Sequence, residues 1–216
     1  SLAENLFYVT YNKDSYKISP ENKFINKNFQ EIVNQGLANI FIKNGGLVES
    51  NGVSHHYVFP SGKHSAKFLR TANVLVNKSE IDFIAINTLH KFKGIKFKNI
   101  YCDTLSINVV GYSICQYLER FDSAETINIE SFKSYEGIYN EHSVFYEDAI
   151  FIISASTSGG IVQYLKEKHP EIHSNNICVL YYLPIDKDSK LALESIICNL
   201  LLKDKLQYGI EFCRDF

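Results

Sequence analysis

The segment from Phe151 to Ile161 carries the residue types best suited to chemistry. Strand-forming apolar residues change there into small hydroxyl residues and two glycines, and a helical pattern follows. Backbone N–H groups at a helix start, with hydroxyls beside them, suit a phosphate oxygen, and glycines let the ligand come close. The segment therefore predicts a phosphate-binding loop at Thr157, Ser158, Gly159 and Gly160, preceded by Ser154 and Ser156. The alternative is that serine and glycine only begin a helix.

Two further groups of polar residues are candidates for a site. Asp103 ends an expected strand, so it lies at the edge of a sheet where ligands bind, and Thr104 and Ser106 follow it. The other role open to Asp103 is to cap the next helix. Lys63 and His64 belong to a local basic cluster with Lys67 and Arg70, and their alternative is a turn with solvated basic side chains.

No metal site is predicted from the residues alone. His55 and His56 are adjacent, so on a strand they point to opposite faces and cannot readily hold one ion. The five cysteines are widely spaced among aliphatic residues and lack metal-ligand spacing. Their odd number and apolar surroundings are typical of buried thiols in a reducing compartment, and the chain is predicted to be cytoplasmic.

The elements that must position these residues alternate along the chain. The pattern predicts an α/β fold with a mainly parallel sheet flanked by helices. Expected strands are 6–11, 56–59, 99–102, 126–129, 149–153 and 177–183, and expected helices are 29–42, one capped by Ser79 that ends near Gly94, 109–118, 161–168 and 191–202. Residues 1–28 are predicted to form an irregular extension, and 29–216 a single domain with a C-terminal helix.

Composition limits the partners that we expect. The chain has 216 residues and a formal net charge of −2, which gives no electrostatic footprint for nucleic acid or for an anionic membrane. No apolar run reaches the length needed to span a bilayer. A small phosphate-bearing or nucleotide ligand is therefore the expected partner, with no nucleic acid and no membrane.

Three segments, in this order, resemble the orotate phosphoribosyltransferase branch of the type I phosphoribosyltransferases. Residues 57–68 are similar to its N-terminal Ser-Gly-(Arg/Lys)-x-Ser segment. Residues 99–118 resemble its strand, pyrophosphate loop and helix, with Asp103-Thr104-Leu105-Ser106 as the loop. The segment 151–161 occupies the place of the signature for 5-phosphoribosyl-1-pyrophosphate (PRPP), and 131–148 is like the mobile hood.

The resemblance implies a phosphoribosyltransferase-like fold, a homodimer, and a ribose-phosphate or nucleotide ligand on the Thr157–Gly160 loop. It places Thr104 and Ser106 at the pyrophosphate, and Lys63 and His64 at the pyrophosphate or base. It leaves Lys133 as the one basic residue of the hood. The cofactor is unknown, and Mg²⁺ is expected if PRPP is the substrate.

One departure from the family pattern bears on activity. The family has two acidic residues before its phosphate loop, and here those positions hold Ile153 and Ser154, or Ser154 and Ala155. Asp103 is the best candidate to replace a carboxylate, with Lys133 as the other candidate catalytic residue. The sequence thus leaves open phosphoribosyl transfer, a catalytically inactive sensor or protein-interaction module of the same fold, and an enzyme of unrelated chemistry.

Overall fold

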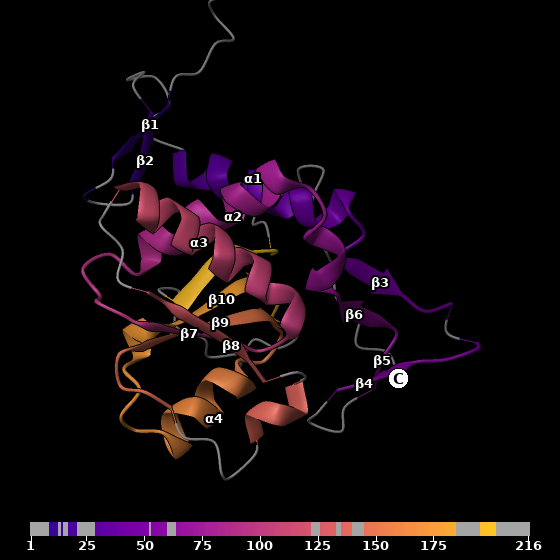
Figure 1. The fold of residues 1–216 in the computed structure, drawn as a ribbon. Helices are drawn as coiled ribbons and strands as arrows, with labels where there is room; N and C mark the ends of the chain where they lie inside the picture. Colours follow the sequence, from indigo (N-terminus) through magenta and orange to yellow (C-terminus); the bar gives the residue numbers. More distant parts are fainter. Residues whose placement is uncertain are drawn as a thin grey trace, which may run out of the picture.

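The computed structural model describes residues 9–12, 14, 17–20, 29–51, 53–59, 64–121, 126–132, 135–139, 145–184 and 195–201. Its centre is a five-stranded sheet in which every neighbouring pair is parallel (Figure 1). The strands, in their order across the sheet, are β11 (Ile196–Asn199), β10 (Ile177–Tyr182), β9 (Ala149–Ser156), β7 (Asn99–Cys102) and β8 (Asn128–Ser131).

The order of these strands reverses between β7 and β9. The chain runs from β7 outward to β8, then returns to the other side of β7 and continues through β9, β10 and β11. In sheets wound in this way, ligands bind outside the carboxyl ends of the strands at the point of reversal. The reversal therefore favours a ligand site at the carboxyl ends of β7 and β9.

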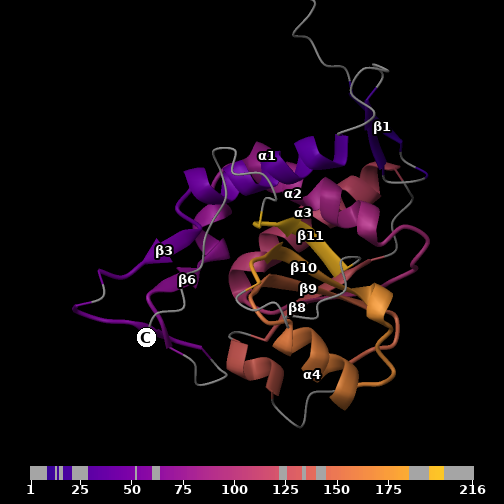
Figure 2. The ribbon, with the colours of Figure 1, turned by 180° about the vertical axis from the view of Figure 1, so that it is seen from behind.

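Helices cover both faces of the sheet. The helices α1 (Phe29–Lys43), α2 (Lys78–Lys91) and α3 (Asn108–Phe121) lie on one face, and α4 (Gly160–Lys168) lies on the other (Figures 1 and 2). Because side chains of a strand alternate between faces, Ile150 and Ile152 of β9 enter the core under α1–α3, and Phe151 and Ile153 enter the core under α4. Burial on both faces explains why β9 is a nearly continuous apolar run.

A β-arm leaves the body between α1 and α2. It consists of β3 (Leu47–Glu49) paired with β6 (Lys67–Leu69), and of β4 (Tyr57–Val58) paired with β5 (His64–Ser65). Figure 2 shows the arm extending away from the sheet. A separate hairpin, β1 (Val9–Asn12) with β2 (Lys17–Pro20), precedes α1. Among the described residues, no helix has the length and apolar character needed to cross a membrane.

Most of the predicted elements are confirmed, including the parallel α/β architecture. The predicted C-terminal helix over 191–202 is wrong where the chain is described, because Ile196–Asn199 is a strand that pairs with β10. Ser79 does not cap α2. The cap is Asn77, whose side-chain oxygen accepts from the Ser79 backbone N–H at 3.0 Å. The N-terminal segment is not wholly irregular, since it contains the β1–β2 hairpin.

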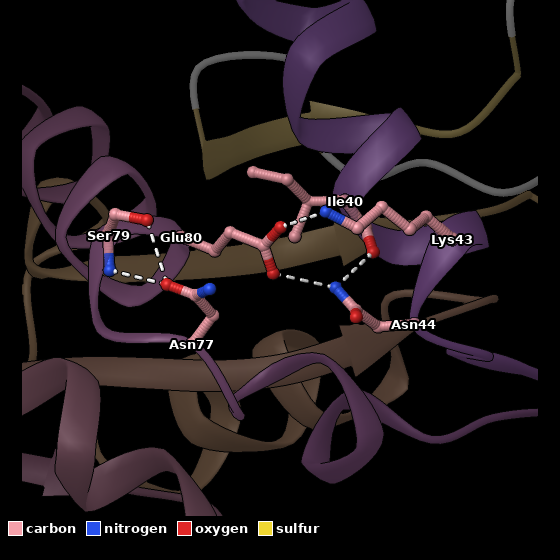
Figure 3. Close-up of polar contacts among 6 residues, drawn as sticks. All are labelled: Ile40, Lys43, Asn44, Asn77, Ser79 and Glu80. Atoms are coloured by element: carbon pink, nitrogen blue, oxygen red, sulfur yellow. Dashed lines mark hydrogen bonds and ion pairs between the residues drawn. The ribbon is translucent and has the colours of Figure 1, made fainter.

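One polar cluster joins the end of α1 to the start of α2 (Figure 3). The Glu80 carboxylate accepts from Lys43 Nζ at 2.5 Å and from Asn44 Nδ2 at 2.8 Å. Asn44 Nδ2 also donates to the Ile40 carbonyl at 3.0 Å, at the end of α1. The hydrogen bond from Lys43 is the largest cause that lowers the pKa of Glu80. The cluster therefore closes the base of the β-arm.

We expect this cluster to make stability depend on pH on the acid side. A lowered carboxyl pKa in the folded state contributes stability above the ordinary value of 4.5, and this contribution is lost as pH falls through the lowered pKa. Glu80→Gln should therefore destabilise the protein at pH near 7 and lose that effect in acid. Urea unfolding at both pH values tests this, with Glu167→Gln on α4 as the control. An equal effect of Glu80→Gln at both pH values would contradict it.

A second prediction concerns the turn that follows α1. A Cβ on Gly46 would lie 2.7 Å from ring atoms of Phe41, which is fully buried. Gly46→Ala should therefore cost about 1–3 kcal/mol of unfolding free energy through overpacking. Gly36→Ala is the matched control. Gly36 lies inside α1, and a Cβ there would meet the Phe83 ring of α2 at an ordinary distance of 3.4 Å. Denaturant melts in which both variants behave alike would rule this packing constraint out.

Candidate active site at the carboxyl ends of β7 and β9

Asp103 and Ser154 form the innermost contact at the point of strand reversal. Asp103 follows β7 directly and is fully buried, while Ser154 lies in β9 and is 6% exposed. One oxygen of the carboxylate, Oδ2, accepts from the Ser154 backbone N–H at 2.9 Å and from Ser154 Oγ at 2.5 Å. The Asp103 N–H donates to the Ile152 carbonyl at 3.2 Å, which extends the β7–β9 ladder by one step.

A third element joins this contact from the base of the β-arm. Thr71 begins the 3₁₀ turn Thr71–Val74 and is buried. Its Oγ1 donates to the Ser154 carbonyl at 3.1 Å. The arm is therefore attached at the same edge of the sheet as the candidate site, and Ser154 is held on both its N–H and its carbonyl side.

The predicted phosphate loop turns sharply from β9 into α4. Gly159 has φ 79°, a left-handed conformation that side-chain-bearing residues adopt at a cost, and α4 begins at Gly160. Within the loop, Ser156 Oγ accepts from the Gly159 N–H at 2.9 Å, and Ser158 Oγ accepts from the Gly160 N–H at 3.3 Å. Two of the donors that would face an anion are thus occupied by the loop's own hydroxyls.

The polar residues after β7 lie at the same edge. Thr104 precedes the 3₁₀ turn Leu105–Ile107, and its Oγ1 lies 3.1 Å from Ser106 Oγ. Both side chains are half-buried. Asn108 starts α3 directly after this turn, and its Oδ1 is buried without a hydrogen-bond partner. The ends of β7 and β9 therefore present hydroxyl and amide groups side by side, which suits a neutral or anionic polar ligand.

The remaining predicted residues do not join this group in the described structure. Lys63 and Lys133 lie outside the described residues. His64 is exposed on β5 of the arm, where its ring stacks on that of His56 with centroids 4.6 Å apart. Phe68 also belongs to the arm and stacks with Tyr57 at 5.4 Å and with Phe59 at 6.4 Å. Only the residues after β7 and β9 are brought together.

The site offers little that could hold a cation. In the described part of the chain, no three His, Cys, Asp or Glu residues converge on one point. Ile153, at one position where the family pattern has an acid, is fully buried in the core under α4. Burial raises the pKa of the Cys102 thiol, next to Asp103, so this group is held as a neutral thiol. The donor set therefore does not fit a Mg²⁺ ion bound by protein carboxylates.

Sequence patterns gave no signal for Thr71 and Asn108 in this region. The Thr71–Ser154 contact joins residues 83 positions apart, and it depends on how the arm docks on the sheet. The sequence around Asn108 is typical of the first residue of any helix. The place of Asn108 at the start of α3, after the loop that contains Thr104 and Ser106, is the one feature that could have indicated it.

Comparison with solved structures gives matches of low identity. UMP synthase from Leishmania donovani is 14% identical, with a TM-score of 0.45, over 68% of this chain and 31% of that protein. Orotate phosphoribosyltransferase from Aeropyrum pernix is 12% identical, with a TM-score of 0.45, over 76% of this chain and 94% of that one. The Francisella tularensis orotate phosphoribosyltransferase is 16% identical, with a TM-score of 0.36, over 74% and 84%.

The chain spans less than a third of the length of the Leishmania protein, at 31%. No family model matches the sequence, and no curated protein matches it. The parallel α/β sheet itself is shown by the strand pairing.

We expect the Asp103–Ser154 contact to be a large contribution to stability. Asp103→Ala leaves two buried Ser154 donors without this acceptor, so it should cost about 3 kcal/mol or more. Asp103→Asn keeps an oxygen acceptor and should cost less. Ser154→Ala removes one donor and should cost about 1 kcal/mol. Urea unfolding of these variants and of the double variant tests the coupling. Additive effects in the cycle would show that the two side chains do not act together.

Proposed function

We propose that this protein binds a phosphorylated ribose or nucleotide at the Thr157–Gly160 loop, as a phosphoribosyltransferase-like protein. The observation that carries the proposal is the left-handed Gly159, at the turn from a buried parallel strand into α4, beside the strand reversal. This is where wound parallel sheets bind ligands and where a helix start favours an anion. Thr104 and Ser106 follow β7, the strand that pairs with β9, and supply hydroxyls for the sugar or a second phosphate.

Phosphate binding here requires an exchange of hydrogen bonds. The N–H groups of Gly159 and Gly160 release Ser156 Oγ and Ser158 Oγ and donate to phosphate oxygens instead. The two freed hydroxyls can then turn and donate to the same phosphate, since a hydroxyl both donates and accepts. Ser158 and Gly160 are exposed, so a ligand can reach them. The loop therefore contains the donors of a phosphate cradle in a closed form.

Transfer of a phosphoribosyl group is the less supported part of the proposal. For this transfer, a carboxylate of the protein must reach the ribose hydroxyls of the ligand. Asp103 is fully buried, however, and its Oδ2 accepts hydrogen bonds from Ser154. Mg²⁺ would have to arrive with PRPP as part of the substrate, because the described residues offer it no carboxylate site. The burial of Asp103 thus favours the second candidate function, a sensor that holds a phosphate ligand without reacting it. A cytoplasmic homodimer remains our expectation for either function.

The phosphate loop can be tested at Gly160. A Cβ there meets Ser158 Oγ at an ordinary 3.4 Å, and an acidic residue is favourable in the first turn of a helix, so Gly160→Asp should fold. Its carboxylate would repel a phosphate, and ribose 5-phosphate binding should fall by at least about tenfold, which corresponds to about 1.4 kcal/mol. Gly160→Asn has nearly the same shape without the charge and should bind within a few-fold of the unsubstituted protein.

Calorimetric titration with ribose 5-phosphate and with PRPP, each with and without Mg²⁺, measures these affinities. Mg²⁺-dependent binding of PRPP would favour transfer, whereas Mg²⁺-independent binding of both ligands would favour the sensor. Equal binding by Gly160→Asp and Gly160→Asn would show that the ligand lies elsewhere. Absence of binding by the unsubstituted protein would reject the phosphate site altogether.

A further inference from the structure

A separate cavity lies on the side of the protein away from the phosphate loop. It has a volume of about 280 Å³ and is lined by Gln30, Val33, Asn87, His90, Lys91, Ile196 and Ile197. These residues come from the start of α1, the end of α2 and the start of β11. The cavity thus sits where three elements from distant parts of the sequence meet.

The strand register places this cavity at the amino-terminal edge of the sheet. Ile196 is the first residue of β11 and pairs with Val179, near the start of β10. The loop proposed to bind phosphate follows Ser156, which pairs with Tyr182 at the other end of β10. The two places therefore lie at opposite edges of one sheet, and a ligand in the cavity would not touch the phosphate loop.

The lining is apolar on one side and polar on the other. Val33 and Ile197 supply aliphatic surface, while Gln30 and Asn87 supply amides. Ile196 also borders the cavity, but its side chain packs against the core under α4. Val33 is 5% exposed and Ile197 packs against the core under α1–α3. Asn34, one residue beyond Val33, fixes α1 to β11 through bonds of 2.9 and 2.8 Å to the Asn199 carbonyl and N–H. The apolar side of the cavity is therefore built on ordered backbone.

Two basic side chains, those of His90 and Lys91, line the cavity. Lys93, Lys96 and Lys98 follow in the sequence, with no acidic residue between His90 and Lys98. Among the described residues of the elements that form the cavity, Glu31 in the first turn of α1 is an opposing charge, and the end of α2 carries a partial charge of about −0.5.

We propose that this cavity is a second binding site, for a small organic anion with an apolar body, such as a carboxylate on a ring or short chain. The aliphatic wall would take the body, and Lys91 with the amides of Gln30 and Asn87 would take the charged group. At about 280 Å³ the cavity is just below the range of about 300–1,000 Å³ typical of pockets for drug-sized ligands, so only a small molecule fits. A charge-assisted hydrogen bond is stronger than a neutral one, so the anion is preferred to a neutral molecule of the same shape.

Three probe molecules separate the parts of this proposal. Benzoate has the charge and the apolar body, benzamide has the same shape without the charge, and acetate has the charge without the body. Titration of ¹⁵N-labelled protein to about 20 mM covers the millimolar dissociation constants of such fragments. We expect benzoate to cause saturable shifts at the amides of Asn87, Lys91, Ile196 and Ile197, and we expect the other two probes to bind at least about tenfold more weakly.

The role of Lys91 is tested by a matched pair of substitutions. Lys91→Gln should weaken benzoate binding about tenfold, because it removes the charged donor in the cavity. Lys93→Gln removes the same charge from the same segment outside the lining and should change the affinity by less than about twofold. The amide spectrum shows whether each variant is folded.

The proposal is overturned if benzoate causes no saturable shift at these amides, or if benzamide binds as tightly. It is also overturned if Lys91→Gln and Lys93→Gln have equal effects, since the response would then report net charge. Shifts confined to residues 157–160 would assign the anion to the phosphate loop instead, and would likewise reject the second site.

Discussion

The buried contact between Asp103 and Ser154 is the constraint on which the rest of the site depends. A carboxylate removed from water is costly unless hydrogen bonds compensate it, and here one oxygen accepts two of them from Ser154. This contact joins β7 to β9 at the point where the chain leaves the sheet after β7. Thr71 holds the carbonyl of the same serine. The loops that follow both strands, and the β-arm, are thus anchored at one residue.

This anchoring limits what chemistry the edge of the sheet can perform. Turning the Asp103 carboxylate toward ribose hydroxyls would leave the two Ser154 donors without this acceptor in the interior, which is costly. The residue that the sequence predicts as the best replacement for a missing catalytic acid thus has a structural role in this arrangement, and its catalytic role stays a prediction. The same contact holds the loop proposed to bind phosphate in place, whether or not a ligand reacts there.

Local sequence patterns predicted the central elements because those elements are strongly periodic. The strand at 99–102 and the helix at 161–168 follow directly from apolar spacing, and the hydroxyl and glycine run correctly marked the turn after β9. The prediction of a helix in the C-terminal segment was wrong for a physical reason. Ile196, Ile197 and Cys198 form a short apolar run that suits a helix or a strand, and pairing with β10 decides between them. Contacts such as Thr71 with Ser154 depend on docking and have no local pattern.

The hydrogen bonds inside the loop proposed to bind phosphate bear on which ligands it could select. Its N–H groups already donate to Ser156 and Ser158 hydroxyls, so a neutral acceptor would exchange one neutral hydrogen bond for another and gain little. A phosphate dianion bound as we propose would replace them with charge-assisted bonds, which are roughly twice as strong, and would also interact favourably with the start of α4. The internal hydroxyls would then compete with the ligand, and a neutral sugar would not displace them. Selectivity for the phosphorylated form would then follow from the loop itself, without any basic side chain.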